Sequence, residues 1–394
     1  MRIAILIGES SLDSGGSHSY AKLLLDGLMT QDSLENELVY FVGSRRLSNS
    51  EFNDGSAFKN NRILGLVSQF RNIAIKKYFS WVFTNMLWIA KIGRYIKAHR
   101  LNKSLRNHEI EFVLSLTPLS FPLTTPYAMP VWDLQHRLQP YWPEVSQKGQ
   151  WAMRESGYSQ SIARATRLIV GTQTGAQELA LLYGVDSKII ILAPFPVKLR
   201  KDIDDSKKDA NLIYYPAQFW PHKNHKNLLL GFKLALDSTG RDLQLVLPGS
   251  DKGNLGFVMS FARELGIIER VSFPGFISDS ELLSLSERAT LQVFPSYFGP
   301  DNLPPLEALA SNCTVAVSRV SGAQDQFGDN VLYFDPDSPE QISDLISKCT
   351  SKGYINPLSQ EKRQEFLVAR QPSVTARIIL TEISKFGGKR RNWK

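Results

Sequence analysis

Short apolar runs that alternate with longer segments of mixed polarity dominate the pattern of this chain. An apolar run of about four to eight residues between turn residues is typical of a buried strand. Such runs lie at residues 2–8, 37–42, 111–116, 129–132, 167–170, 188–192, 211–215, 242–247, 271–273, 291–294 and 314–318. Helical segments are expected between them, at about 18–29, 175–183 and 254–265, with Thr172 or Thr174 as a cap and Gly184 as an end. This alternation predicts an α/β fold with doubly wound, Rossmann-like domains.

One charged stretch interrupts the pattern and divides the chain. Residues 197–210, VKLRKDIDDSKKDA, show no apolar period, which is typical of a linker. We therefore predict an N-terminal domain over residues 1–196 and a C-terminal domain over residues 211–375, followed by a helix end and a basic tail over 376–394. The length of 394 residues suits two or three domains of about 150 residues each.

The stretch 290–318, TLQVFPSYFGPDNLPPLEALASNCTVAVS, carries the strongest functional signal. Its order of apolar run, polar loop, helix and apolar run predicts one βαβ unit, with the loop at the carboxyl edge of a sheet. Pro304 and Pro305 suit a first helical turn, where backbone N–H groups and the helix dipole favour an anion. Glu307, expected in that turn, has the chemistry to bind ribose hydroxyls. The stretch thus predicts a nucleotide-diphosphate pocket, although an ordinary βαβ loop with a surface glutamate fits the same residues.

Three further strand ends carry candidate residues. Gly15 and Gly16 follow the first strand, where glycine lets a backbone approach a ligand or simply makes a tight turn. Asp133 and His136 follow a strand at the edge where open α/β sheets bind ligands, but a helix cap and a surface histidine fit equally. Lys223 begins a helix after another strand. It either neutralises a diphosphate leaving group or is a solvated surface lysine.

The run FGPDNLPPLEALASN resembles the signature of the retaining glycosyltransferases of family 4, which have the two-domain GT-B fold. The resemblance covers nearly the whole chain and is strongest over residues 210–335. Most members of that family carry two glutamates separated by seven residues, and the second matches Glu307. The first falls on Gly299. Members also carry G-R, four residues and K, where Lys223 matches the lysine and Gln218 takes the place of the arginine.

The resemblance also implies roles for individual residues. In the family the N-terminal glycine loop faces the donor phosphates, the backbone near Phe276 and Ile277 meets the nucleobase, and the first glutamate contacts the donor sugar. Members have a His-Asp pair where this chain has Trp132 and Asp133, so His136 is the candidate substitute for the histidine. The implied catalytic residues are Asp133, His136 and Lys223, and the implied donor-binding residues are Gly15, Gly16, Gln218, Lys223, Phe276, Ile277, Gly299, Asn302, Leu303 and Glu307.

Composition and charge narrow the class of protein. With 43% hydrophobic and 21% charged residues, the chain is expected to be globular. The net charge of +8 fits phosphorylated substrates and anionic lipid, and no nucleic-acid-binding motif is present. Two cysteines fit a reducing cytoplasm. No Asp-x-Asp motif lies near the expected diphosphate position, so we expect neither a metal ion nor a resident cofactor.

Residues 76–100, KKYFSWVFTNMLWIAKIGRYIKAHR, are apolar in the middle and basic at both ends. The apolar part is well short of the ~20 residues that span a bilayer. The segment is typical of a helix that lies on an anionic membrane face, but a half-buried helix packed on the sheet has the same pattern.

Together these features predict a retaining, metal-independent glycosyltransferase. We expect a nucleotide-sugar donor, and a glycan acceptor that is lipid-linked at the inner face of the cell membrane. The product would be a cell-surface polysaccharide, such as O-antigen, capsule or exopolysaccharide, and the enzyme would be cytoplasmic or peripheral. Two alternatives stay open: a nucleotide-sugar 2-epimerase with the GT-B fold, and a non-catalytic partner that binds nucleotide sugars.

Overall fold

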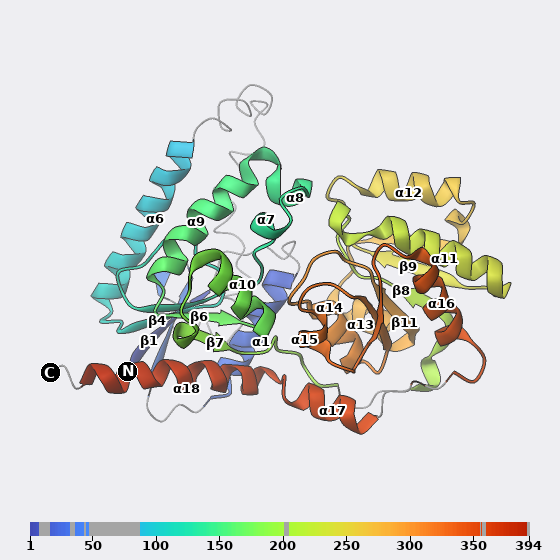
Figure 1. The fold of residues 1–394 in the computed structure, drawn as a ribbon. Coiled ribbons are helices and arrows are strands. Elements are labelled where there is room, and N and C mark those ends of the chain that lie inside the picture. The colour runs from blue at the N-terminus through green and yellow to red at the C-terminus, as the bar shows by residue number, and fades with distance from the viewer. Residues whose placement is uncertain are drawn as a thin grey trace.

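The computed structural model describes residues 1–7, 16–31, 36–42, 45–46, 87–200, 205–354, 356 and 360–391. Two sheets form in this part of the chain, and Figure 1 shows them side by side, each with helices packed around it. The N-terminal half carries the first sheet and the C-terminal half the second, and the chain passes from one to the other between residues 192 and 209. This arrangement confirms the predicted pair of Rossmann-like domains.

The first sheet has the order β3-β2-β1-β4-β5-β6-β7, and the second has the order β10-β9-β8-β11-β12-β13. All described pairings are parallel except the one between β2 and β3, which is antiparallel. The strands are β1 (Arg2–Ile7), β2 (Glu37–Val42), β3 (Arg45–Arg46), β4 (Phe112–Ser115), β5 (Tyr127–Pro130), β6 (Arg167–Val170), β7 (Ile190–Leu192), β8 (Asp209–Tyr214), β9 (Gln244–Pro248), β10 (Val271–Gly275), β11 (Ala289–Phe294), β12 (Thr314–Ser318) and β13 (Leu332–Phe334).

Helices connect the strands and cover the sheets. The helices are α1 (Gly16–Met29), α6 (Leu87–Asn107), α7 (Gln135–Leu138), α8 (Pro143–Ser146), α9 (Gln150–Arg164), α10 (Gln173–Tyr183), α11 (His225–Thr239), α12 (Leu255–Glu264), α13 (Asp279–Arg288), α14 (Leu303–Ala310), α15 (Ala323–Phe327), α16 (Pro339–Thr350), α17 (Gln360–Val368) and α18 (Pro372–Arg391). None of the described helices is long and apolar enough to cross a membrane.

The apolar runs located most strands to within two residues, because buried parallel strands are continuous hydrophobic segments. The caps of α10 were also predicted correctly: the Thr172 side chain accepts from the Gly175 N–H, and Gly184 ends the helix in the left-handed conformation. Of the segment 76–100, residues 76–86 lie outside the described part. From residue 95 onward, α6 exposes Tyr95 and buries Leu101 against the first sheet.

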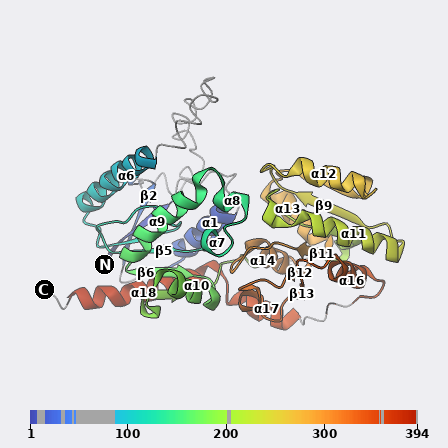
Figure 2. The same cartoon turned by 45° about the horizontal axis from the view of Figure 1, so that its top comes forward.

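The last helix returns to the first half of the molecule. Figures 1 and 2 both show α18 running along the N-terminal half, where it packs against α1. The contact is close, because an ideal Cβ on Gly27 of α1 would lie 2.0 Å from the Pro372 carbonyl oxygen. Gln31 also donates to the Ser373 carbonyl over 3.1 Å.

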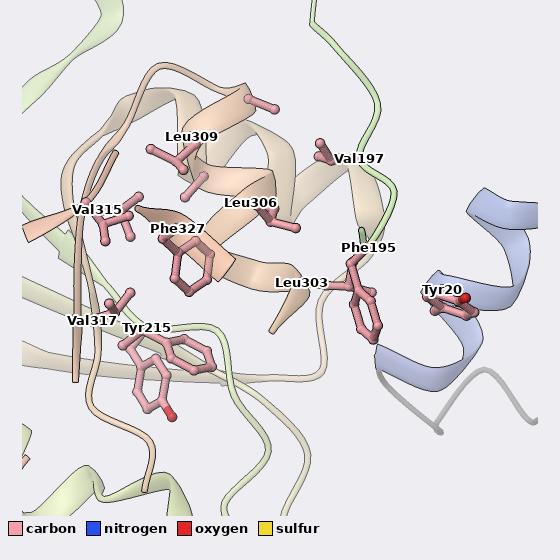
Figure 3. Close-up of a cluster of buried hydrophobic side chains, with 14 of the residues drawn as sticks. Tyr20, Phe195, Val197, Tyr215, Leu303, Leu306, Leu309, Val315, Val317 and Phe327 are labelled. Atoms are coloured by element: carbon pink, nitrogen blue, oxygen red, sulfur yellow. The ribbon is translucent and has the colours of Figure 1, made fainter. Parts of the chain in front are cut away.

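An apolar contact joins the two halves near the linker. Figure 3 shows Tyr20 of α1 and Phe195 beside Leu303, the first residue of α14. The Tyr20 and Phe195 ring centroids are 4.8 Å apart, and all three side chains belong to one buried cluster that includes both sheets. The start of α14 is therefore fixed at the boundary between the two halves.

Candidate active site

A cavity of about 350 Å³ lies between the two halves, and residues of both line it. Its walls come from segments that follow the carboxyl ends of strands β5, β8 and β11, the edge at which open α/β sheets bind ligands. The lining residues are Trp132, Asp133, Glu144, Val145 and Arg154 from the first half and Trp220, His222, Lys223, Phe298, Gly299, Pro300, Asp301 and Asn302 from the second. Four of the predicted site residues are thus together here: Asp133, Lys223, Gly299 and Asn302.

Asp133 is the carboxylate that the first half contributes. Its Oδ1 accepts from Nη2 of Arg154 at 2.7 Å and from the Gln135 N–H at 3.0 Å. Burial opposes its ionisation, but Arg154 and these hydrogen bonds outweigh that effect, and the pKa of Asp133 lies below its usual value. An ionised carboxylate beside a guanidinium therefore faces the cavity.

Lys223 is the cation that the second half contributes. Burial lowers the pKa of Lys223 to about 8, although Asp133 and Glu144 oppose the effect. Its Nζ lies 5.3 Å from the centroid of the Phe294 ring. Lys226 does not share this position, because it is exposed and its Nζ lies 6.0 Å from the Phe261 ring on α12. The second positive charge at the cavity comes instead from Arg154, in the other half.

Gln218, at the position of the family arginine, lies just outside this cavity. Its Oε1 accepts from Nε1 of Trp220 at 3.0 Å, and Trp220 is the residue that lines the wall. Gln218 therefore supports the orientation of an indole ring next to Lys223.

The loop of residues 298–302, which we call the donor loop, has a conformation that depends on glycine. Gly299 has a φ of +139°, and an ideal Cβ there would lie 2.2 Å from Nδ2 of Asn302. The glutamate found at this position in the resembling family would not fit this loop. The glycine at this position therefore suits the backbone conformation of the donor loop.

The amides at the start of α14 are fewer than the sequence led us to expect. The Asn302 N–H already donates to Oε1 of Gln326 at 2.9 Å, and the Asn302 carbonyl accepts from Nε2 of the same residue at 2.9 Å. Pro304 and Pro305 have no N–H to offer. The Leu303 N–H, at the first position of α14, is therefore the amide left as a candidate contact for an anion.

Glu307 lies deeper in α14 than predicted. Because the helix begins at Leu303 rather than at the prolines, Glu307 is in the second turn, and the first-turn argument for it was wrong. Burial raises the pKa of Glu307, Asp279 adds to the effect, and Arg200 opposes it. Glu307 is not among the residues that line the 350 Å³ cavity.

The remaining donor-binding candidates lie near the start of α13. Ile277 and Phe276 immediately precede α13, and Phe276 is 64% exposed. Helix α1, whose first residue is Gly16, faces the same place, since Lys22 pairs with Asp279 at 3.5 Å. Gly15 lies outside the described residues. The candidates thus form two groups, one at the cavity and one along α14 toward α13.

The structure does not bring His136 to the cavity. Its ring is fully buried in the first half, with Nε2 3.2 Å from Oε2 of Glu155 and 3.3 Å from the Tyr183 hydroxyl. Glu155 also pairs with Arg137. Because α7 turns this side chain toward α9, His136 has the contacts of a core histidine, and we do not retain it as a substitute for the family histidine.

Two lining residues that form a contact between the halves were not predicted to act together. The His222 N–H donates to Oε1 of Glu144 at 3.0 Å, and Nδ1 of His222 contacts the same oxygen. The His222 ring stacks on Phe298, with centroids 3.8 Å apart, and burial lowers the pKa of His222 to about 4. Neither Glu144 nor Arg154 was among the predicted site residues. Glu144 follows β5 in the same polar stretch as Asp133, whereas Arg154 lies in the middle of α9 and gave no signal.

Comparison with known proteins finds a family match in the second half. Residues 198–366 match the family model described as Glycosyl transferases group 1, which is less than half of the chain. The chain is 28% identical over 201 residues to the O-antigen chain mannosyltransferase RfbU of Salmonella typhimurium, covering 48% of this chain and 55% of that protein. It is 31% identical over 130 residues to O-antigen chain mannosyltransferase B of Escherichia coli, covering 33% of this chain and 34% of that protein. The chain thus spans about half or less of the length of these relatives.

A solved structure extends the likeness over the whole chain. The sucrose-phosphate synthase of Thermosynechococcus elongatus superposes with a TM-score of 0.67 at 14% identity, covering 99% of this chain and 100% of that one. Since the identity is low, this likeness concerns the fold, and it confirms the predicted GT-B architecture. The group 1 match and the similar mannosyltransferases support a glycosyltransferase.

Proposed function

We propose that this protein transfers a sugar from a nucleotide-diphosphate sugar to a glycan acceptor, with retention of the anomeric configuration. The observation that carries the proposal is the cavity between the halves, where Asp133 and Arg154 of the first half face Lys223 and the donor loop of the group 1 domain. An ionised carboxylate, two cations and a helix amide are the groups that such a transfer needs.

In this proposal the donor lies along α14. Its diphosphate contacts Lys223 and the Leu303 N–H, its ribose contacts Glu307, and its base lies against Phe276 and Ile277. The sugar then faces Asp133 and the donor loop. When the anomeric bond breaks, negative charge develops on the diphosphate, and preorganised cations in a partly dry cavity stabilise it strongly.

Lys223 and Arg154 take the place that a divalent ion would have in this scheme. Both cations face the cavity, and they come from opposite halves. We therefore propose that transfer does not require a metal ion. Full activity in the presence of EDTA is the expected result, and loss of activity that Mg²⁺ restores would contradict this part of the proposal.

The acceptor is proposed to be a growing cell-surface polysaccharide, lipid-linked at an anionic membrane face. The names of the two relatives reported above, both O-antigen chain mannosyltransferases, support this choice and make mannose the first donor sugar to test. Binding to anionic vesicles in a flotation assay is expected, and its absence would remove the membrane part of the proposal.

Nucleotide binding is the first experiment. The purified chain is heated with UDP, GDP, dTDP or ADP, and the nucleotide that binds the folded state is expected to raise the melting temperature. Glu307→Ala should abolish that shift, because the ribose hydroxyls lose their acceptor. Glu264→Ala, which removes an exposed glutamate at the end of α12, is the matched control.

Each contrary outcome has a meaning. An unchanged affinity in Glu307→Ala would rule out the ribose role. Isomerisation of the donor sugar without acceptor would identify a 2-epimerase. Binding of a nucleotide sugar without turnover on any acceptor glycan would indicate a non-catalytic partner.

A further inference from the structure

The amino end of α10 receives acidic side chains from the other half of the molecule. This helix has no acidic residue in its own first turn, although its N–H groups and dipole favour negative charge there. Thr172 satisfies the Gly175 N–H. The Thr174 N–H instead donates to Oδ2 of Asp325 at 2.7 Å, and the Thr174 hydroxyl lies 3.2 Å from the same oxygen.

Asp301 of the donor loop makes the second such contact. Its carboxylate lies against the backbone of Gly171, which follows strand β6. An ideal Cβ on Gly171 would lie 2.1 Å from Oδ1 of Asp301 and 2.5 Å from its Cγ. Only a residue without a side chain leaves room for this carboxylate, and Oδ1, buried there, has no hydrogen-bond partner in the described structure.

The two contacts are connected within the second half. Asp325 and Gln326 are neighbours on α15, and Gln326 binds both the N–H and the carbonyl of Asn302. One short helix thus contacts α10 and also holds the donor loop. Asp301 lies between Pro300 and Asn302, so its position fixes the loop that lines the cavity.

We propose that Asp301 and Asp325 form a latch on the amino end of α10, which closes the cavity and sets the conformation of the donor loop. Asp301 is then a positioning residue: it acts on the donor through the backbone of its loop. The latch deepens the proposed function, because a nucleotide-diphosphate donor would meet an ordered loop only when the halves are closed.

The latch has a pH dependence of defined sign. The titratable groups that face Asp301 are Tyr20 of α1, Glu178 of α10, Asp325 of α15 and Arg370. Burial raises the pKa of Asp301 well above its usual value, Asp325 and Glu178 add to the effect, and Arg370 opposes it. Burial also raises the pKa of Glu178 to about 7. Opening returns the Asp301 carboxyl group to water, so the closed form binds more protons and loses stability as pH rises through the raised pKa of Asp301.

Gly171→Ala tests the latch without changing any group that lines the cavity. The new methyl group would collide with Asp301 when the halves close. Gly175→Ala on the same helix is the matched control, since its Cβ would make ordinary contacts, the nearest at 3.4 Å to Oγ1 of Thr172. Hydrogen exchange of the amides at 171–175, the radius of gyration from small-angle scattering and the affinity for a nucleoside diphosphate are measured for both.

The expected result is faster exchange at the Thr174 amide, a larger radius of gyration and about tenfold weaker nucleotide binding for Gly171→Ala, with wild-type values for Gly175→Ala. Wild-type exchange and radius of gyration in Gly171→Ala would overturn the latch. If no nucleotide binds the wild-type chain, the proposed function fails, but exchange and scattering still decide on the latch.

A second pair of variants keeps the test valid if Gly171→Ala does not fold. Asp301→Asn keeps a side chain of the same size against Gly171 but cannot ionise, whereas Asp301→Ala removes the contact. We expect Asp301→Asn to keep the exchange protection and to reduce its pH dependence, and Asp301→Ala to lose the protection. Equal protection in Asp301→Ala and wild type at every pH would overturn the proposal.

Discussion

Two cations from opposite halves face one cavity, and they differ in how firmly they hold their charge. Burial acts to lower the pKa of Arg154, but its ion pair with Asp133 and the nearby Tyr158 outweigh this effect and hold the pKa above its usual value. Lys223 has no ion pair in the described structure, and burial lowers its pKa to about 8. Lys223 is therefore the group whose charge an incoming anion would stabilise most.

Lys223→Met is expected to weaken the binding of the nucleoside diphosphate by about 10- to 100-fold, the range for loss of one hydrogen bond to a charged group. Lys226→Met, which changes an exposed lysine three residues further along the chain, should bind as wild type does. Calorimetric titration measures both. Equal affinities of Lys223→Met and wild type would remove the lysine from the donor site.

The pH profile gives a second readout of the same residue. The lysine carries its proton below about pH 8, so its own contribution to anion affinity should be complete there and fall as pH rises through that value. Lys223→Met should lack this step. A step of the same size in the variant would assign the titration to another group.

At the scale of an element, the β11–donor loop–α14 unit shows what the sequence could determine. The apolar runs predicted both strands, and the two prolines predicted the helix. Both signals depend only on neighbouring residues in the sequence. The hydrogen bond from the Asn302 N–H is made to Gln326, 24 positions further along the chain. Neither this contact nor the backbone conformation of Gly299 could be deduced from the local sequence.

Gly299→Glu restores the residue expected from the family pattern, and we predict that it impairs the protein. Its φ of +139° is one that residues with a side chain rarely adopt, and the new Cβ would collide with Asn302. A cost of about 1–3 kcal/mol is expected for such strain. Thermal unfolding should show a lower midpoint and calorimetry a weaker nucleotide affinity. Gly256→Glu, on the exposed side of α12, controls for the added charge. Tighter nucleotide binding by Gly299→Glu would refute the prediction.

At the scale of the whole molecule, contacts between the halves decided which predicted residues share a site. The strand ends placed Asp133 and Lys223 at the edges of their sheets, and the GT-B resemblance implied that these edges face each other. The sequence could not show which way the His136 side chain points. In the structure α7 turns His136 into the first half, whereas His222, which was not a candidate, pairs with Glu144 across the boundary.

The return of α18 to α1 has a further consequence for the stability of the whole chain. The close approach of Gly27 to Pro372 ties the end of the chain to the first half after it has passed through the second. Phe386, near the end of α18, also packs on Phe112 of β4, with ring centroids 5.6 Å apart. The folding of the first half thus depends on residues that follow the second.

Gly27→Ala tests this dependence, because helix propensity and packing against α18 predict opposite changes in the thermal stability of this variant. Alanine in a helix interior is favoured over glycine by about 1 kcal/mol, so an isolated α1 would gain stability. Here the methyl group would meet the Pro372 carbonyl at 2.0 Å, and overpacking of this kind costs about 1–3 kcal/mol. We therefore expect the thermal midpoint to fall, whereas Gly256→Ala, with nothing within 4 Å, should leave it unchanged or slightly raised. A raised midpoint in Gly27→Ala would mean that α18 is not held against α1, and the first half would then have to be stable without the end of the chain.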